Sequence, residues 1–145
     1  MTFSRATSLG TYYLIAASIP FARGRRPFIS APRSCYLTAN IVASVISGGG
    51  IDIAARGVTL DLNGFQISGG GNTRTGVGIH LEDRATNCAI RNGSITSFQA
   101  GLACTYLDPI GYSPYGRISQ VDVSGCFVGL NFDGLSDFQL RGQRE

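Results

Sequence analysis

The amino-acid sequence predicts an all-β protein built from short strands that recur in repeating units. Three observations support that fold class. Glycine supplies 20 of the 145 residues, which is about twice its usual share and is typical of a turn-rich chain. Apolar and polar residues alternate over three to five positions at many places, as in strands, and no longer window carries a helical stripe. A glycine-led motif also recurs four times along the chain.

The recurring motif is a glycine followed by an apolar, a polar and an apolar residue. Its copies lie at 50–53, 78–81, 101–104 and 129–132, so that they follow one another at nearly even intervals. Each copy has the period-two alternation of a short strand. The regular spacing therefore predicts one strand at the same place in each of four structural repeats.

A second strand-like run follows each motif, at 58–62, 88–91, 121–123 and 138–140. These runs end in the pairs 63–64, 92–93, 124–125 and 141–142, in which we expect glycine to supply the positive φ of a sharp corner. A short third run comes after the first three corners, at 65–67, 94–96 and 126–128. Each repeat is thus expected to contain three short strands with corners between them.

Three short strands in each of these short repeats can wind as one coil that stacks on the next. The sequence thus predicts a single-stranded, right-handed parallel β-helix, a solenoid of about four coils, over residues 27–145, because crossovers between parallel strands are overwhelmingly right-handed. Equivalent inward residues then form columns. We expect one column of Ile51, Ile79, Leu102 and Leu130, and a second of Leu60, Ile90 and Val121.

Residues 1–26 are predicted to be a leader or an N-terminal extension. Arg5 followed by the apolar stretch 9–21 has the outline of a secretory signal segment, and the stretch is too short to span a bilayer. On this interpretation the protein is secreted, periplasmic or at the cell surface, with no transmembrane segment. The alternative is an alternating strand that packs on the first layer of the fold.

Composition excludes several classes of function. All twelve cations are arginine, so no lysine is present for a phosphate loop or a Schiff base. The net charge of +3 is modest and four arginines crowd into 23–33, which gives no basic face for nucleic acid.

The four cysteines (35, 88, 104 and 126) include no close pair and His80 is the only histidine, so no metal site is predicted. We expect buried thiols, with two disulfides as the alternative.

Residues 27–30, 35–41, 50–53 and 57–65, followed by 90–95, carry a family resemblance. They resemble right-handed parallel β-helix proteins of the pectin-lyase-like superfamily, over about residues 27–142. That superfamily includes polysaccharide lyases, hydrolases and phage tailspike domains. The resemblance implies the coil and leaves the reaction open.

Outward residues of the second runs should stack in a line of Asp61, Arg91, Asp122 and Gln139. Lyases of the resembled family combine acidic calcium ligands with an arginine base. The resemblance therefore makes Asp61, Arg91 and Asp122 candidate catalytic residues, with calcium as the candidate cofactor. The simpler alternative, which we prefer, is a surface ladder of opposite charges without catalysis.

A second outward column contains Asp52, His80, Ala103 and Asn131. A histidine beside a carboxylate can act as a general base near neutral pH. An exposed polar column on a strand needs no such role, and no serine or cysteine nucleophile accompanies it. We prefer that simpler interpretation.

The first corner of each repeat varies most in length, and its longest copy, 105–117, holds three of the six tyrosines. Tyrosine rings suit contact with sugar rings, and such insertions often carry binding function. The candidate ligand-binding residues are Tyr106, Asp108, Tyr112, Tyr115, Arg117, Glu82 and Asp83. A carboxylate pair across this edge could serve a glycosidase, whereas in a structural alternative the tyrosines cover the edge of the coil.

These patterns together predict a non-catalytic module that binds a polysaccharide or glycan surface, or has a structural role, outside the cell. The alternative is a short or partial polysaccharide lyase or glycosidase. The last coil should expose strand edges and the apolar residues Leu130, Phe132, Phe138 and Leu140. Because unpaired edges attract other strands, we expect self-association through this end.

Overall fold

The computed structural model of the chain describes residues 8–9, 12–15, 28–32, 34–43, 49–69, 76–82, 84–104, 115–132 and 137–141. At 8–9, 12–15, 115, 132 and 137–141 it describes the backbone. These residues form fourteen strands in two sheets and no helix. The all-β prediction is therefore confirmed, and the described residues contain no helix able to cross a bilayer.

The larger sheet has the strand order β1-β2-β4-β7-β10-β12-β14, with β8 pairing both β5 and β10. Only β1 and β2 pair antiparallel within it, and its other pairs are parallel. Its strands are β1 (Ser8–Leu9), β2 (Tyr12–Ile15), β4 (Ser34–Leu37), β5 (Ile41–Ala43), β7 (Thr59–Asp61), β8 (Gln66–Gly69), β10 (Cys88–Thr96), β12 (Tyr115–Ser124) and β14 (Asp137–Arg141).

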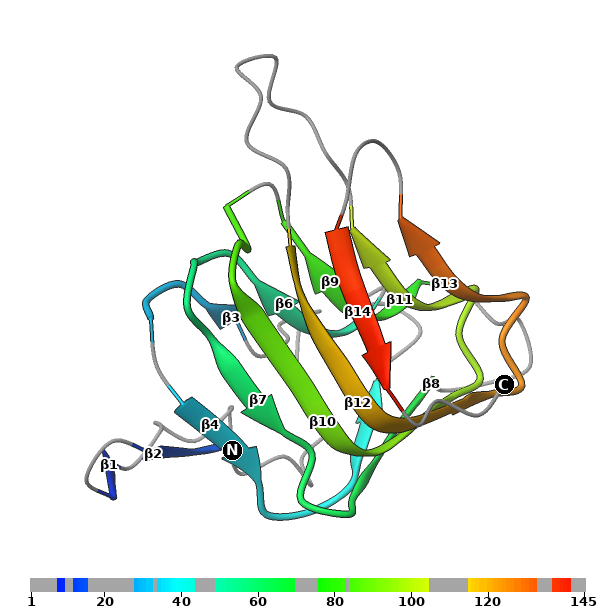
Figure 1. The fold of residues 1–145 in the computed structure, drawn as a ribbon. Helices are drawn as coiled ribbons and strands as arrows, with labels where there is room; N and C mark the ends of the chain where they lie inside the picture. Colours follow the sequence, from blue (N-terminus) through cyan, green and yellow to red (C-terminus); the bar gives the residue numbers. More distant parts are fainter. Residues whose placement is uncertain are drawn as a thin grey trace.

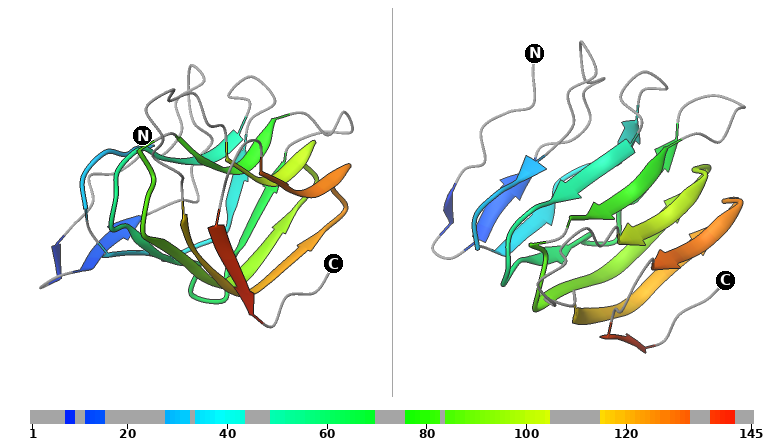
Figure 2. Two further views of the ribbon diagram at one scale, coloured as in Figure 1. Left: turned by 45° about the horizontal axis from the view of Figure 1, so that its top comes forward. Right: turned by 90° about the horizontal axis from the view of Figure 1, so that it is seen from above.

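The smaller sheet is entirely parallel and has the order β13-β11-β9-β6-β3. From β3 onward the chain passes back and forth between the two sheets (Figure 1). In both sheets the strands lie in chain order from one end of the stack to the other (Figure 2). The strands of the smaller sheet are β3 (Phe28–Ile29), β6 (Gly49–Ile53), β9 (Val77–Leu81), β11 (Ala100–Cys104) and β13 (Val128–Phe132).

The first predicted column is confirmed in the smaller sheet, where Ile51 pairs with Ile79, Ile79 with Leu102, and Leu102 with Leu130. The glycines that lead the first three motifs have a steric cause. A Cβ atom at Gly78 would lie 2.5 Å from the Gly101 carbonyl oxygen and 2.5 Å from Ile95 Cγ2. Added Cβ atoms at Gly50 and Gly101 would also lie less than 3.0 Å from neighbouring atoms, whereas at Gly129 the nearest atom is 3.9 Å away, so the close approach explains the first three copies.

The second predicted column is wrong at its third member. Leu60 pairs with Ile90, and Ile90 pairs with Ile118, whereas Val121 lies opposite Gly93. The reason is that β12 begins at Tyr115, so its first half precedes the predicted run 121–123 and pairs with the run 88–91, while 121–123 pairs with the second half of β10. On its other side β10 pairs with β7 through its first half and with β8 through its second half. The predicted run 126–128 is not a separate strand, because Val128 begins β13.

The corner between the halves of β10 depends on asparagine. Asn92 has a φ of 67°, and Asn63 has a φ of 54° at the equivalent corner after β7. Asparagine tolerates this left-handed region better than most residues. Gly93, expected to take the positive φ, is instead a glycine because a Cβ atom there would lie 2.7 Å from the Phe65 carbonyl oxygen. At the pair 124–125 the expectation is confirmed, since Gly125 has a φ of 61°.

One hydrophobic cluster joins the two sheets. Full burial of one valine, leucine, isoleucine or phenylalanine side chain contributes about 1.5–3 kcal/mol to the free energy of unfolding. The largest side chains that are fully buried are Phe98, Leu37, Ile41, Ile51, Ile53, Leu60, Leu62, Ile67, Ile79, Leu81 and Ile90.

The N-terminal segment contributes to the larger sheet. Strand β2 pairs in parallel with β4, so that Tyr13 lies opposite Cys35 and Ile15 opposite Leu37. This pairing is what the strand interpretation of the segment expects. The division of the chain after residue 26 and the cleavage of a leader remain predictions.

Candidate functional site

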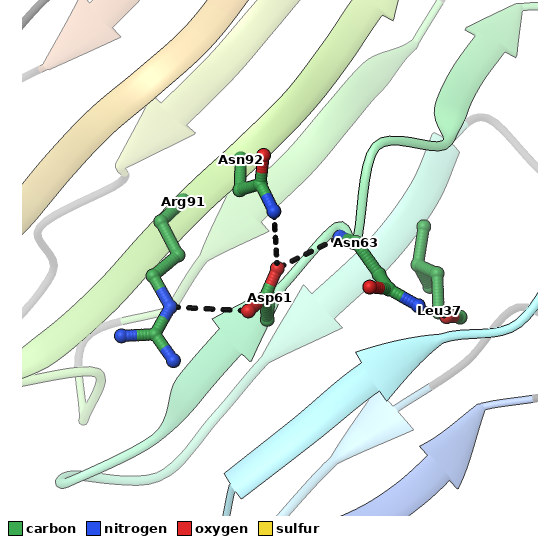
Figure 3. A network of polar contacts seen from close by, with 5 residues as sticks. All are labelled: Leu37, Asp61, Asn63, Arg91 and Asn92. Atoms are coloured by element: carbon green, nitrogen blue, oxygen red, sulfur yellow. Dashed lines mark hydrogen bonds and ion pairs between the residues drawn. The ribbon is translucent and has the colours of Figure 1, made fainter.

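Asp61 and Arg91 lie opposite each other on β7 and β10, as the ion ladder predicts. Arg91 Nε lies 3.2 Å from Asp61 Oδ2, and the two side chains are 46% and 22% exposed (Figure 3). Solvent screens a pair with this exposure, so its expected contribution to stability is about 0–1 kcal/mol.

The second carboxylate oxygen of Asp61 holds the neighbouring corner. Asp61 Oδ1 accepts hydrogen bonds from the Asn63 backbone N–H at 2.8 Å and from Asn92 Nδ2 at 3.3 Å (Figure 3). Asn63 Nδ2 in turn donates to the Leu37 carbonyl oxygen at 3.1 Å. We call Asp61, Asn63, Arg91 and Asn92 the corner network. Its contacts fix the two residues with positive φ and link three successive strands of the larger sheet.

Asp122 does not join the corner network. It was predicted to stack on Arg91, but Ser119 occupies that position, and Asp122 pairs with Ser94. Gln139 is likewise displaced and pairs with Arg117. The shift arises because β12 begins at Tyr115, several residues before the predicted run. Of the three candidate catalytic residues, the structure brings Asp61 and Arg91 together and leaves Asp122 on another row.

The second outward column is confirmed in register, with Asp52 opposite His80, His80 opposite Ala103, and Ala103 opposite Asn131. Its expected exposure is wrong at Asp52 and Ala103, which are only 5% and 6% exposed. His80 Nδ1 lies 3.4 Å from Asp52 Oδ1, and the side chain of His80 is 25% exposed. The side chains of Asp52, His80 and Ala103 are thus largely shielded from solvent, whereas Asn131 is exposed.

Glu82 extends this column to a third ionisable side chain. It follows His80 by two residues, which places both on the same face of the chain as it leaves β9. Its backbone N–H donates to the Ile53 carbonyl oxygen at 2.8 Å, which holds it beside the end of β6. One ligand atom from each of Asp52, His80 and Glu82 lies within 4.8 Å of the other two. We call these three residues the His80 cluster.

The His80 cluster was not predicted from the sequence, because Glu82 was expected in a corner and Asp52 was expected to be exposed. A usable signal was present in the spacing. A His-x-Glu pattern at the end of a strand places two ligands on one face, and the repeat places Asp52 beside them. The burial of Asp52 could not be read from that pattern.

The predicted ligand-binding edge is described only in part. Glu82 is half-buried and Arg117 is exposed. Tyr115 and Arg117 lie on strand β12, so the expectation that they belong to the long corner is wrong. The remaining members lie outside the described residues: Asp83, Tyr106, Asp108 and Tyr112.

The cysteines follow the buried-thiol interpretation. None of the four forms a disulfide; Cys35, Cys88 and Cys104 are buried, and Cys126 is half-buried. Burial raises the pKa of the Cys104 thiol to about 11, with a further contribution from Cys88. Burial also raises the pKa of Cys88, against weaker opposing hydrogen bonds from the backbone. These thiols pack as small apolar side chains.

Fold and site together define an all-β protein with two mainly parallel sheets, a hydrogen-bonded corner network and a partly buried cluster of ionisable groups. No protein-family model, curated protein or solved structure matches the chain.

Proposed function

We propose that the chain is a right-handed parallel β-helix of about four coils that serves outside the cell as a non-catalytic carbohydrate-binding module. The pairing of equivalent strands supports the solenoid, since partners lie one sequence repeat apart throughout β6–β9, β9–β11, β7–β10 and β10–β12. Membership of the pectin-lyase-like superfamily is part of this proposal and rests on the sequence resemblance. The location outside the cell rests on the signal-like outline of residues 9–21, although β2 within that stretch pairs with β4 in the larger sheet.

The observation that carries the binding role is the register at one edge of the stack. The corner 82–87 leaves from Leu81 and the connection 105–114 leaves from Cys104, and these two residues are Cα partners. The connections also return at neighbouring positions, since Cys88 follows the first and pairs with Gly116, the residue after Tyr115, where the second ends. Because the ends of the two connections lie side by side, we propose that Glu82 and the tyrosines within 105–114 contact one ligand.

The contacts of the corner network favour a module without catalysis. Both carboxylate oxygens of Asp61 accept hydrogen bonds from the protein, and Arg91 faces Asp61. A calcium ligand and an arginine base would need these groups for substrate and metal instead. Asp122 also lies on a different row of the larger sheet from Asp61 and Arg91, because it pairs with Ser94.

A polysaccharide retention assay tests the binding role. We expect Tyr106→Ala combined with Tyr112→Ala to abolish retention on an immobilised acidic or neutral polysaccharide while the thermal midpoint stays within a few degrees of wild type. Phe28→Ala is the matched control, since Phe28 is an exposed aromatic residue, at 54%, on β3 at the other end of the smaller sheet. Unchanged retention in the double variant would leave 105–114 with a structural role.

The same protein sample tests the enzymatic alternative. Under the proposal, no unsaturated sugar accumulates with or without calcium, and no reducing ends appear. Unsaturated product that disappears in Arg91→Ala would establish a lyase. Reducing ends that disappear in Glu82→Gln would establish a glycosidase that uses the carboxylates of this edge.

We also propose that the chain self-associates through the end of the stack formed by β13 and β14. These are the end strands of the two sheets in the described part of the chain. Val128, the first residue of β13, and Phe127, which precedes it, are 44% and 68% exposed. Light scattering should show oligomers that Phe127→Asp reduces and that Val42→Asp, at a similarly exposed position on β5, does not. A monomer at high concentration would contradict the proposal.

A further inference from the structure

We propose that Asp52, His80 and Glu82 form a binding site for a divalent transition-metal ion such as Zn²⁺. Within the described part of the chain, these are the three side chains of metal-ligating type whose ligand atoms come together. The site is separate from the corner network, which lies on the larger sheet.

Rigid elements position two of the three ligands. Asp52 and His80 occupy interior positions of β6 and β9 and are direct Cα partners. The residues that flank them, Ile51, Ile53, Ile79 and Leu81, are fully buried in the core. The backbone hydrogen bond from Glu82 to Ile53 carries the third ligand to the same two strands. Little rearrangement of the backbone is needed to bring the three groups onto one ion.

The separation of Asp52 and His80 suits metal ligands. Bond lengths of about 2.0–2.2 Å place neighbouring ligands of a tetrahedral ion roughly 3.3–3.6 Å apart. Asp52 Oδ1 and His80 Nδ1 are 3.4 Å apart, which lies within that range. The side chain of Asp52 is 8% exposed, so a side chain that is more than nine-tenths buried directs one carboxylate oxygen at the imidazole.

The ligand types indicate which class of ion binds. Calcium and magnesium prefer oxygen ligands alone, whereas an imidazole nitrogen suits zinc, copper, nickel and iron. Two carboxylates balance the charge of a divalent ion, and bound metal is one of the few ways in which a protein stabilises a buried carboxylate. Three protein ligands leave a further coordination position to water, as in catalytic zinc sites.

Zinc binding by the reduced, chelator-treated and tag-free chain tests this proposal. We expect one Zn²⁺ per chain in competition with a chromophoric chelator, with no displacement by millimolar Ca²⁺. His80→Ala and Glu82→Gln should each weaken binding by at least about tenfold. Asp122→Asn is the matched control, because it removes an exposed carboxylate from the other sheet. Cys126→Ser tests the half-buried thiol as an alternative ligand.

Nuclear magnetic resonance gives a second readout that needs no variant. His80 is the only histidine of the chain, so every imidazole signal belongs to it. We expect Zn²⁺ to shift the Nδ1 resonance while circular dichroism stays that of folded β structure. Unperturbed ring signals at saturating Zn²⁺, equal affinity in His80→Ala, or loss of binding only in Cys126→Ser would each overturn the site. The Tyr106/Tyr112 double variant should bind Zn²⁺ normally, which separates this proposal from carbohydrate binding.

Discussion

The corner network and the His80 cluster both place a carboxylate opposite a nitrogen-bearing side chain of the next strand, yet they have different chemistry. Around Asp61 the neighbours are hydrogen-bond donors: a backbone N–H, an amide and a guanidinium group. In the His80 cluster the three groups that converge can all donate electron pairs. Donors around one carboxylate fix a corner, whereas several electron-pair donors together suit a cation. The identity of the neighbours, more than the presence of an acid, separates a structural site from a binding site.

The largest loss of stability should come from shortening the buried side chains next to the two sites. We expect Ile79→Ala, next to His80, and Ile90→Ala, next to Arg91, each to lower the free energy of unfolding by about 2–5 kcal/mol, because both side chains are fully buried. Urea denaturation measures this. A loss well below that range at either position would mean that the core relaxes around the cavity.

Replacing Gly78, near the His80 cluster, or Gly64, in the corner network's turn, should lower stability for different physical reasons. Gly78→Ala, two residues before His80, forces a Cβ atom against the Gly101 carbonyl and should cost about 1–3 kcal/mol. Gly64→Ala has nothing within 4 Å of its new Cβ atom but has a φ of +79°, so it should cost about 1–2 kcal/mol. Gly64→Asn separates the two causes, since asparagine should recover part of the loss at Gly64, and Gly78→Asn should recover none.

Alkaline pH should weaken the fold through the thiol at the end of β11. The pKa of Cys104 is about 11 in the folded chain against an ordinary value of 9.0. Its contribution to stability is therefore complete below pH 9 and is lost as the pH rises through about 11, because the unfolded chain releases the proton first. The stability difference between wild type and Cys104→Ala, measured by urea denaturation, should shrink over this range. A constant difference would contradict the raised pKa.

The smallest effect should come from the ion pair of the corner network. Arg91→Ala should cost less than about 1 kcal/mol, and molar salt should reduce that cost further, because the pair is partly exposed. Thermal denaturation at low and high salt measures both. A cost equal to that of Ile90→Ala would assign Arg91 a larger role than a surface pair.

The sequence predicted the register of those strands whose positions are fixed by the glycine-led repeat. The first column and the polar column beside it were confirmed because glycine marks the start of each copy. The third copy of the second run was misplaced because Ile118 and Val121 are both apolar and alternate with polar neighbours, so either could continue the column. Only pairing with Ile90 distinguishes them. The His80 cluster depends on the burial of Asp52, a tertiary property that period-two alternation does not encode.

The spacing between partners also has a consequence for how the chain folds. Each strand of the central stack finds its neighbour one repeat further along the chain, so every step closes a loop of similar length and similar entropic cost. Folding can therefore begin at one pair of repeats and spread in either direction, without waiting for the ends of the chain to meet. The rate should depend on how quickly the first pair forms and only weakly on how many repeats follow.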